Sequence, residues 1–467
     1  MSTLKKKKSF TERMTDYVSE KIAPPLVKLS QNRYLDSLQK SFITLMPFLI
    51  MGATATLVLN LSGLFASGTG LNLPAVADAI SKVTDAWKPW LLQIVFVSIN
   101  LLALAIAILN GYYLGQFYAD KDKRISPIST AITSMVAFLS FIDFSLLSEN
   151  FDWPGYWLGA PNLFSAIIIS ILAVELYRWI VGKNITIKMP DSVPPMIAAA
   201  FTSMIPVCVI MVLFSIVGRG FENFDFMSLI NTAFSYLVVA GSGPVAQFFG
   251  FFLDRLLWFV GLHGSNIVSS VMQPIWTQMI TENINAFAQH SPIKYMFTEQ
   301  WINFYVRCSV FPVALLCCQS KVKRFKALGK LSLPGTIFNI AEPIMYGLPI
   351  VLNPLMFVPW VLGFSVLFIL NAILGVLGIT PPMVAMVVWT MPAPLASYIG
   401  SGFNILAPII TCVNIVIIYF MFLPFFRAME KQELAAEMKR TEETAVISND
   451  GSAAAAMPAE HSEKSNQ

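Results

Sequence analysis

The chain has 467 residues, of which 56% are hydrophobic and only 12% are charged. A soluble domain is about 45–50% apolar and about 25% charged, so this composition excludes an ordinary soluble protein. The apolar excess instead predicts an all-α integral membrane protein whose helices face lipid. The formal net charge of +4 does not indicate nucleic-acid binding, because the cations cluster at the ends of apolar stretches, as they do in cytoplasmic loops.

The first part of the chain predicts a short cytoplasmic segment followed by a membrane half. Residues 1–35 are polar and basic, with an amphipathic pattern from Phe10 to Leu29, and we expect them to lie on the cytoplasmic membrane face. Residues 36–225 form the N-terminal membrane half, in which apolar stretches predict five spans. These spans are expected at about 41–61, 91–114, 126–142, 163–181 and 197–217. The loop at 145–162 contains no Lys or Arg, whereas the loops at 121–124 and 178–188 are basic, so the N-terminus is expected inside.

The second membrane half, residues 226–427, is less regular. Clear spans are expected at about 243–262, 302–318, 354–377 and 403–425. The more polar stretch 266–287 predicts one further crossing, which would give about ten spans and place both termini in the cytoplasm. Residues 428–467 are charged and then rich in Ala, Ser and Glu, so a disordered cytoplasmic tail is expected.

Two apolar segments in this half are interrupted by proline. Leu333–Pro354 contains Pro343 and Pro349, and a second segment at Pro381–Gly400 is interrupted by Pro392 and Pro394. Backbone that cannot form a continuous helix is tolerated at membrane depth only inside protein or beside a water-filled cavity. Interrupted segments of this kind point to a transporter binding site, although an ordinary proline-kinked helix has the same pattern.

The polar groups near these interruptions suggest a site for a sugar. His263 follows a span that contains Trp258. Asn339 and Glu342 lie in the first interrupted segment, and Trp389 lies in the second. Ionisable groups at membrane depth are usually functional. Sugars are bound by planar polar groups and by flat aromatic faces, although each of these residues taken alone is as consistent with a structural role.

No metal or cofactor is expected. The five cysteines lie in or beside apolar runs without the spacing of metal ligands, and the sequence contains no glycine-rich phosphate-binding loop. The partners indicated by the residues are a sugar and membrane lipid, and no nucleic acid.

Four segments together resemble enzyme IIC of the lactose/cellobiose/diacetylchitobiose family of the bacterial phosphotransferase system. They are PDSVPP at Pro190–Pro195, LLWFVGLHG at Leu256–Gly264, FNIAEPIMYGLPIVLNP at Phe338–Pro354, and WTMP at Trp389–Pro392. The similarity extends over residues 20–427, with the motifs in the same order and at similar spacing.

The resemblance implies a homodimer in the bacterial plasma membrane, with about ten spans and two re-entrant hairpins in each subunit. The N-terminal half would form the dimer interface and the C-terminal half would carry the sugar. A β-linked disaccharide such as cellobiose or diacetylchitobiose would be presented to a separate enzyme IIB phosphorylated on cysteine. Glu342 and His263 would hold the reacting hydroxyl, with Trp258 and Trp389 packed on the sugar and Asn339 also in contact with it.

Two departures from the family pattern concern the binding pocket. Ala341 stands where the family usually has asparagine, and Tyr305 and Arg307 lie where it usually has glycines. They predict a pocket that is smaller or differently charged. Two other functions remain open from the residues: a proton-coupled sugar symporter, in which Glu342 and His263 carry protons, and a membrane sugar receptor that has lost transport.

Overall fold

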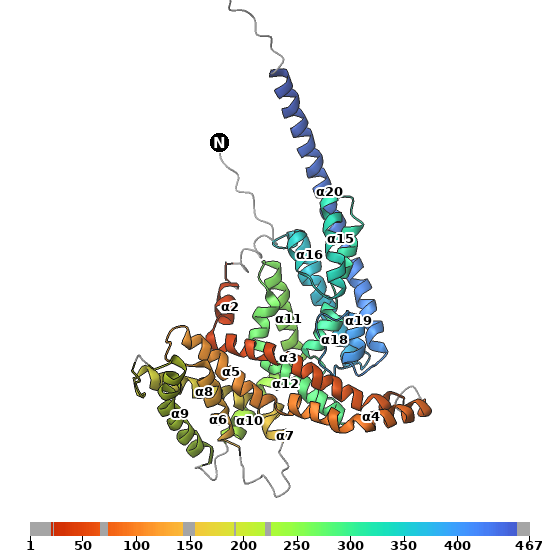
Figure 1. Cartoon of the computed structure of the whole chain (residues 1–467). Coiled ribbons are helices and arrows are strands. Elements are labelled where there is room, and N and C mark those ends of the chain that lie inside the picture. Colours follow the sequence, from red (N-terminus) through yellow and green to blue (C-terminus); the bar gives the residue numbers. More distant parts are fainter. Residues whose placement is uncertain are drawn as a thin grey trace, which may run out of the picture.

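The computed structural model describes residues 20–21, 23–65, 73–142, 155–190, 193–219 and 226–454, and within these it contains helices and no strand. Figure 1 shows most helices of the first half at the lower left, with its red and orange helices running to the lower right, and much of the second half (green to blue) rising above them. Parts of two sequence features, the loop at 145–162 and the PDSVPP motif, lie outside the described residues, as does most of the amphipathic N-terminal segment.

The first half contains six long helices and several short ones. The long helices are α3 (Arg33–Leu59), α4 (Pro74–Val95), α5 (Leu102–Ala119), α6 (Pro127–Leu139), α8 (Leu163–Gly182) and α9 (Pro195–Arg219). The short elements are α2 (Ala23–Ser30), η2 (Leu61–Phe65), the π-helix η3 (Phe96–Asn100), α7 (Gly155–Leu158) and η5 (Ala160–Asn162). The predicted span at 91–114 therefore begins inside α4, because an unexpected amphipathic helix precedes α5.

The second half contains more interruptions. Its elements are α10 (Phe226–Ser242), α11 (Pro244–Phe259), α12 (Gly264–Ala288), α13 (Glu299–Trp301), the π-helix η6 (Ile302–Arg307), α14 (Phe311–Cys318), α15 (Lys323–Ile337), α16 (Glu342–Gly347), α17 (Pro354–Phe357), the π-helix η7 (Val358–Gly363), α18 (Phe364–Val376), α19 (Ala393–Gly400) and α20 (Leu406–Ala454). Single turns of π-helix occur mostly inside longer helices and often at functional sites. Here η6 joins α13 to α14 within one apolar segment.

Seven segments of the described chain are long and apolar enough to cross a membrane, and α10 with α11, bent by 70°, makes an eighth. The all-helical membrane class is therefore confirmed. The two other crossings in the predicted set of about ten correspond to α6 and α12. Helix α6 has only 13 residues, and α12 has 25 residues with many buried Thr, Asn and Ser side chains. Helix α6 is thus apolar but short, and α12 is long but more polar than the other spans.

Close backbone contact explains how the helices of the first half pack. Helix α5 lies against α6, and a Cβ atom at Gly111 or Gly115 would collide with Ser134 or Thr130 of α6. Two glycines four residues apart lie on one face of a helix and let a second helix approach closely. This is common in membrane proteins, because lipid is as apolar as the side chains and helices associate through close packing instead of the hydrophobic effect. Residues from α5, α6, α8 and α9 form one buried apolar cluster, and a larger cluster spans both halves.

The second interrupted segment is irregular and enclosed by protein. Residues 381–388 form no helix, and their backbone groups bond to side chains from other elements. The amide of Asn283 donates to the Met383 carbonyl over 2.9 Å, and the Val387 N–H donates to Gln300 Oε1 over 3.3 Å. Such partners satisfy the backbone where water is absent, as the proline pattern of the sequence predicts.

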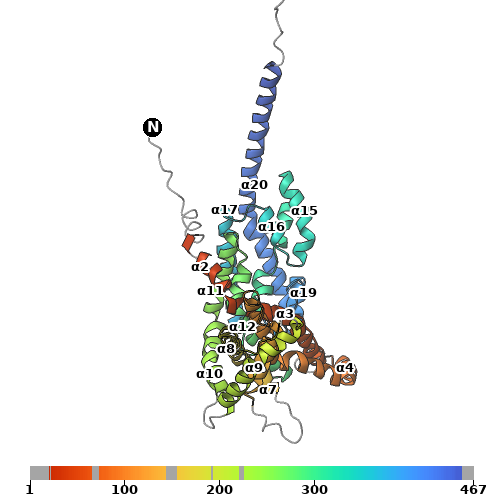
Figure 2. The same ribbon diagram turned by 60° about the vertical axis from the view of Figure 1, so that its left-hand side comes forward.

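Helix α20 projects well beyond the rest of the molecule (Figures 1 and 2). It continues to Ala454, through most of the segment 428–467 for which disorder was expected. The segment is rich in Ala, Glu, Lys and Met, which favour helix and extend the preceding span. At its base, the Glu430 carboxylate accepts hydrogen bonds from Ser320 Oγ (2.7 Å) and the Lys321 N–H (2.6 Å), which anchor α20 to the loop before α15. Arg427 Nη1 of the same helix also donates to Glu430 over 2.8 Å.

Candidate functional site

The turn between α11 and α12 places His263 at the start of a helix. Gly261 has a φ of 86°, a conformation that glycine adopts without steric cost. His263 is the N-cap of α12, and its Nδ1 accepts a hydrogen bond from the Asn266 N–H over 3.3 Å. A neutral imidazole bonded in this way carries its proton on Nε2. At Gly264, a Cβ atom would collide with the Asp254 carbonyl and contact Trp258, so glycine allows α12 to start directly against α11.

Glu342 is the first residue of α16, the short helix inside the first interrupted segment. The turn after α16 is fixed to α11, since the Leu352 N–H donates to the Phe259 carbonyl over 2.9 Å. This places Glu342 Oε1 4.0 Å from His263 Nε2, with the two side chains 45% and 40% exposed. Glu342 Oε2 is buried without a hydrogen-bond partner in the described part of the chain. The arrangement thus brings a partly exposed carboxylate side chain and an imidazole side chain together from two segments far apart in the sequence.

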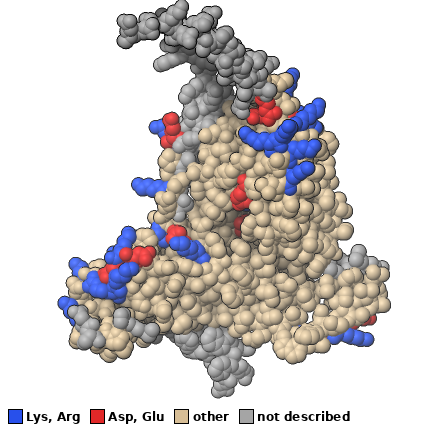
Figure 3. All heavy atoms as spheres, turned by 45° about the horizontal axis from the view of Figure 1, so that its top comes forward, with Lys and Arg blue, Asp and Glu red and all other residues tan. Residues whose placement is uncertain are grey.

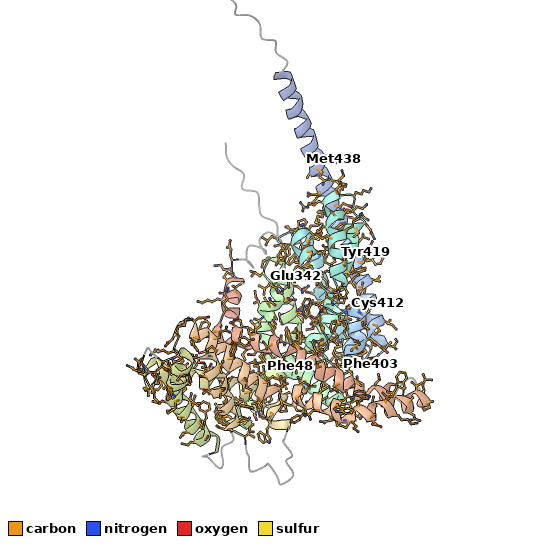
Figure 4. The ribbon with its side chains drawn as sticks, in the orientation of Figure 1. Phe48, Glu342, Phe403, Cys412, Tyr419 and Met438 are labelled. Carbon is orange, nitrogen blue, oxygen red and sulfur yellow. The ribbon has the colours of Figure 1, made fainter. Side chains whose placement is uncertain are left out.

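Figure 4 shows Glu342 close to α11 and α16, below the projecting end of α20. In the space-filling view of Figure 3, Asp and Glu atoms lie within a hollow near the middle of the face, and Lys and Arg atoms gather toward its edges. The hollow carries few other charges on this face.

Asn339 links the two interrupted segments. Its side-chain amide donates 2.8 Å hydrogen bonds to the carbonyls of both Trp389 and Met391. The residue has a φ of 62°, in the left-handed region that Asn tolerates better than most residues. Asn339 Oδ1 is buried and has no partner among the described residues. The amide nitrogen therefore holds the backbone at Trp389, and the sugar contact expected from the sequence stays a prediction.

The two tryptophans differ in their surroundings. Trp389 is 47% exposed, whereas Trp258 is only 5% exposed. The Trp258 ring lies 4.4 Å from the His263 ring between centroids, and its Nε1–H donates to Ser265 Oγ over 3.2 Å. In this arrangement, Trp389 presents a free face and Trp258 supports the imidazole. Direct contact of Trp258 with sugar remains a prediction.

Tyr305 and Arg307 lie in η6 and point to different partners. Tyr305 is fully buried, with its ring 5.7 Å from that of Trp301. Arg307 Nη2 lies 3.0 Å from Asp254 Oδ2, so its charge is paired inside the protein. Sequence reasoning missed Asp254 and Arg255, although two charged residues inside an apolar span are themselves a signal for a buried site.

The interrupted helices and the grouped imidazole, carboxylate and indoles are features of a multi-span membrane transport protein. Residues 39–363 match the family model described as "Phosphotransferase system, EIIC", and the chain therefore belongs to this family. It is the sugar permease component of a phosphotransferase system, and such components work together with a sugar substrate and an EIIB component. The resemblance seen in the sequence is confirmed.

Known proteins resemble the chain over most of its length. The oligo-beta-mannoside-specific EIIC component of Bacillus subtilis is 29% identical, covering 94% of this chain and 99% of that protein. The lactose-specific EIICB component of Staphylococcus aureus (strain N315) is 28% identical, covering 91% of this chain and 73% of that protein. The crystal structure of the transporter ChbC, the IIC component from the N,N'-diacetylchitobiose-specific system, superposes with a TM-score of 0.79 at 27% identity and covers 90% of this chain and 99% of that one.

Proposed function

We propose that this permease carries a β-linked disaccharide and holds one of its hydroxyl groups between Glu342 and His263 for phosphorylation. The observation that carries this proposal is the 4.0 Å approach of the Glu342 carboxylate to His263 Nε2, across two segments far apart in the sequence. The substrate class is supported by the relatives, whose names specify an oligo-beta-mannoside, lactose and N,N'-diacetylchitobiose. All of these are β-linked sugars, and cellobiose is the simplest further member of that class.

The two side chains suit complementary steps of phosphoryl transfer. The sugar hydroxyl attacks the phosphorus of a phosphocysteine on EIIB, so that a P–O bond forms and the P–S bond breaks. Glu342 accepts the hydroxyl proton, and the His263 Nε2–H donates to the same oxygen and orients it. The cysteine leaves as a thiolate. Since phosphoryl transfer depends mainly on positioning and charge, these two groups supply what the protein must add.

The exposed faces fit the rest of the proposal. The hollow of Figure 3 opens on a face with Lys and Arg along its edges, which supports a cytoplasmic opening toward a separate EIIB chain, with both termini on that side. The exposed apolar side chains of α9, including Val212 and Ile216, would contact lipid or a second copy of the chain. We place a homodimer interface on the half formed by residues 36–225 and the moving sugar carrier in residues 226–427.

The test uses inside-out membrane vesicles loaded with radiolabelled cellobiose or diacetylchitobiose and supplied outside with phosphorylated EIIB. We expect sugar phosphate to appear outside the vesicles. Glu342→Gln should reduce its formation about 100- to 10,000-fold, the usual effect of losing a general base. Glu282→Gln is a matched control, because Glu282 pairs with Lys294 at 3.0 Å rather than with the site. Full activity of Glu342→Gln would contradict the proposed role.

A further inference from the structure

A buried group of charges lies behind the candidate site. Asp254 of α11 is fully buried, and its Oδ2 lies 2.8 Å from Arg255 Nη2 and 3.0 Å from Arg307 Nη2. The Arg255 side chain is 7% exposed, and its guanidinium carbon lies 4.9 Å from the ring centre of Trp360. Arg307 also donates from Nη1 to Asn303 Oδ1 over 2.9 Å. The carboxylate is thus held by two cations that are themselves fixed.

The other oxygen of the same carboxylate leads to the candidate site. Asp254 Oδ1 accepts a hydrogen bond from Ser265 Oγ over 2.8 Å, and Ser265 Oγ accepts one from Trp258 Nε1–H over 3.2 Å. The Trp258 ring then packs against the His263 ring at 4.4 Å. Asp254, Ser265 and Trp258 therefore form an unbroken series of contacts from the buried charges to the imidazole.

The contacts of Asp254 indicate which residue of this series orients the next. A buried ion pair is weak evidence for stability, because well-packed apolar residues often replace one without loss. Asp254 has two cationic partners on one oxygen, which leaves the second oxygen as a strong, fixed acceptor. That acceptor orients the Ser265 hydroxyl, whose lone pair then receives the indole N–H. The rotation of the Trp258 ring, and so the surface on which His263 rests, is set by this hydrogen bond.

We propose that Asp254 and Ser265 are positioning residues of the sugar site, which hold the Trp258 indole and through it keep the His263 imidazole directed at Glu342. Arg255 and Arg307 hold the Asp254 carboxylate in place. The catalytic consequence rests on the proposed function, because it assumes that His263 orients the reacting hydroxyl. The positioning of His263 itself does not depend on that function.

The first test measures the position of His263 without any activity. The chain has three histidines, so His290→Asn with His461→Ala leaves His263 as the only one. In this background, in lipid nanodiscs, the rate of carbethoxylation by diethyl pyrocarbonate is followed by absorbance. We expect Ser265→Ala to raise the rate at least threefold, because the indole that covers one side of the imidazole is released. Ser270→Ala is the matched control, since it removes a buried hydroxyl from the same helix that, within the described part of the chain, bonds to the Ile267 carbonyl over 2.7 Å.

The second test measures sugar phosphate formation in an otherwise native chain. Ser265→Ala and Trp258→Phe should each lower kcat about tenfold and leave KM within twofold. The double variant should be no worse than either, because both changes break the same hydrogen bond. Arg307→Ala should lower kcat in the same way, and Arg307→Lys should restore part of it.

An unchanged carbethoxylation rate in Ser265→Ala overturns the proposal, and so do losses of kcat that multiply in the double variant. A wild-type chain that forms no sugar phosphate refutes the proposed function instead. In that case, the modification rate alone decides whether Ser265 positions His263.

Discussion

Two substitutions at Asn339 can distinguish the contribution of its hydrogen bonds to sugar binding from that of its backbone conformation. Its amide donates to the carbonyls of Trp389 and Met391, each over 2.8 Å, and its φ is 62°. Glycine at this position keeps the positive φ without strain and removes both donors, whereas alanine removes both donors and adds strain. Comparing Asn339→Gly with Asn339→Ala therefore distinguishes the two contributions.

The structure sets the size of the effect. Two hydrogen bonds at about 0.5–1.5 kcal/mol each give about 1–3 kcal/mol for Asn339→Gly. Alanine in the left-handed region adds about 1–2 kcal/mol. If the sugar binds only when Trp389 is held by this contact, a loss of 1–3 kcal/mol corresponds to about 5- to 150-fold weaker binding. Asn339→Ala should bind the sugar roughly tenfold more weakly than Asn339→Gly.

Equilibrium binding of radiolabelled sugar to the purified protein in nanodiscs measures this directly. Asn184→Gly serves as the matched control, because Asn184 also has a positive φ, of 58°, but lies in the loop after α8 and contacts Arg124. We expect Asn184→Gly to bind the sugar with wild-type affinity. Wild-type affinity in Asn339→Gly would refute the link between the two interrupted segments and sugar binding.

Two further predictions concern packing, and both are read from the thermal midpoint of the protein in detergent. Gly115→Ala should destabilise the fold by about 1–3 kcal/mol through overpacking against Thr130 of α6, whereas Gly182→Ala, where a Cβ meets nothing within 4 Å, should be neutral or slightly stabilising. An equal midpoint for both variants would contradict the close contact of α5 with α6. Glu430→Ala should cost about 1.5–3 kcal/mol, because it leaves Ser320 and the Lys321 N–H without their acceptor. Glu433→Ala, whose carboxylate lies 3.9 Å from Arg324, should cost less than about 1 kcal/mol, and a similar loss in both would argue against an anchor at Glu430.

Local chemistry made part of the molecule predictable. Proline removes a backbone donor, so Pro343 and the prolines after Trp389 mark where a helix cannot continue. The resemblance to the enzyme IIC family implied that Glu342 and His263 act together, and the two side chains lie 4.0 Å apart. The composition alone predicted a membrane class, and seven or eight apolar spans confirm it.

Other features depend on contacts between distant segments. Asp254 and Arg307 pair because α11 packs near η6, and no local pattern indicates which cation a buried carboxylate meets. Asn339 was expected to bind sugar, yet its amide nitrogen bonds to two carbonyls that follow it by about 50 residues in the second interrupted segment. Helix α4 was not predicted, because its charged residues interrupt the apolar pattern in the sequence. Helix α10 was not predicted as a separate element, because it and α11 belong to one apolar stretch that bends by 70°.

The central claim is that sugar crosses the membrane to be phosphorylated and is not driven by a proton gradient. Inside-out vesicles loaded with cellobiose and supplied with phosphorylated EIIB test it most directly, with and without a proton uncoupler. We expect sugar phosphate to form at the same rate in both conditions, and to be lost in Glu342→Gln. Sugar movement that stops on addition of the uncoupler, with no sugar phosphate formed, would instead identify a proton symporter.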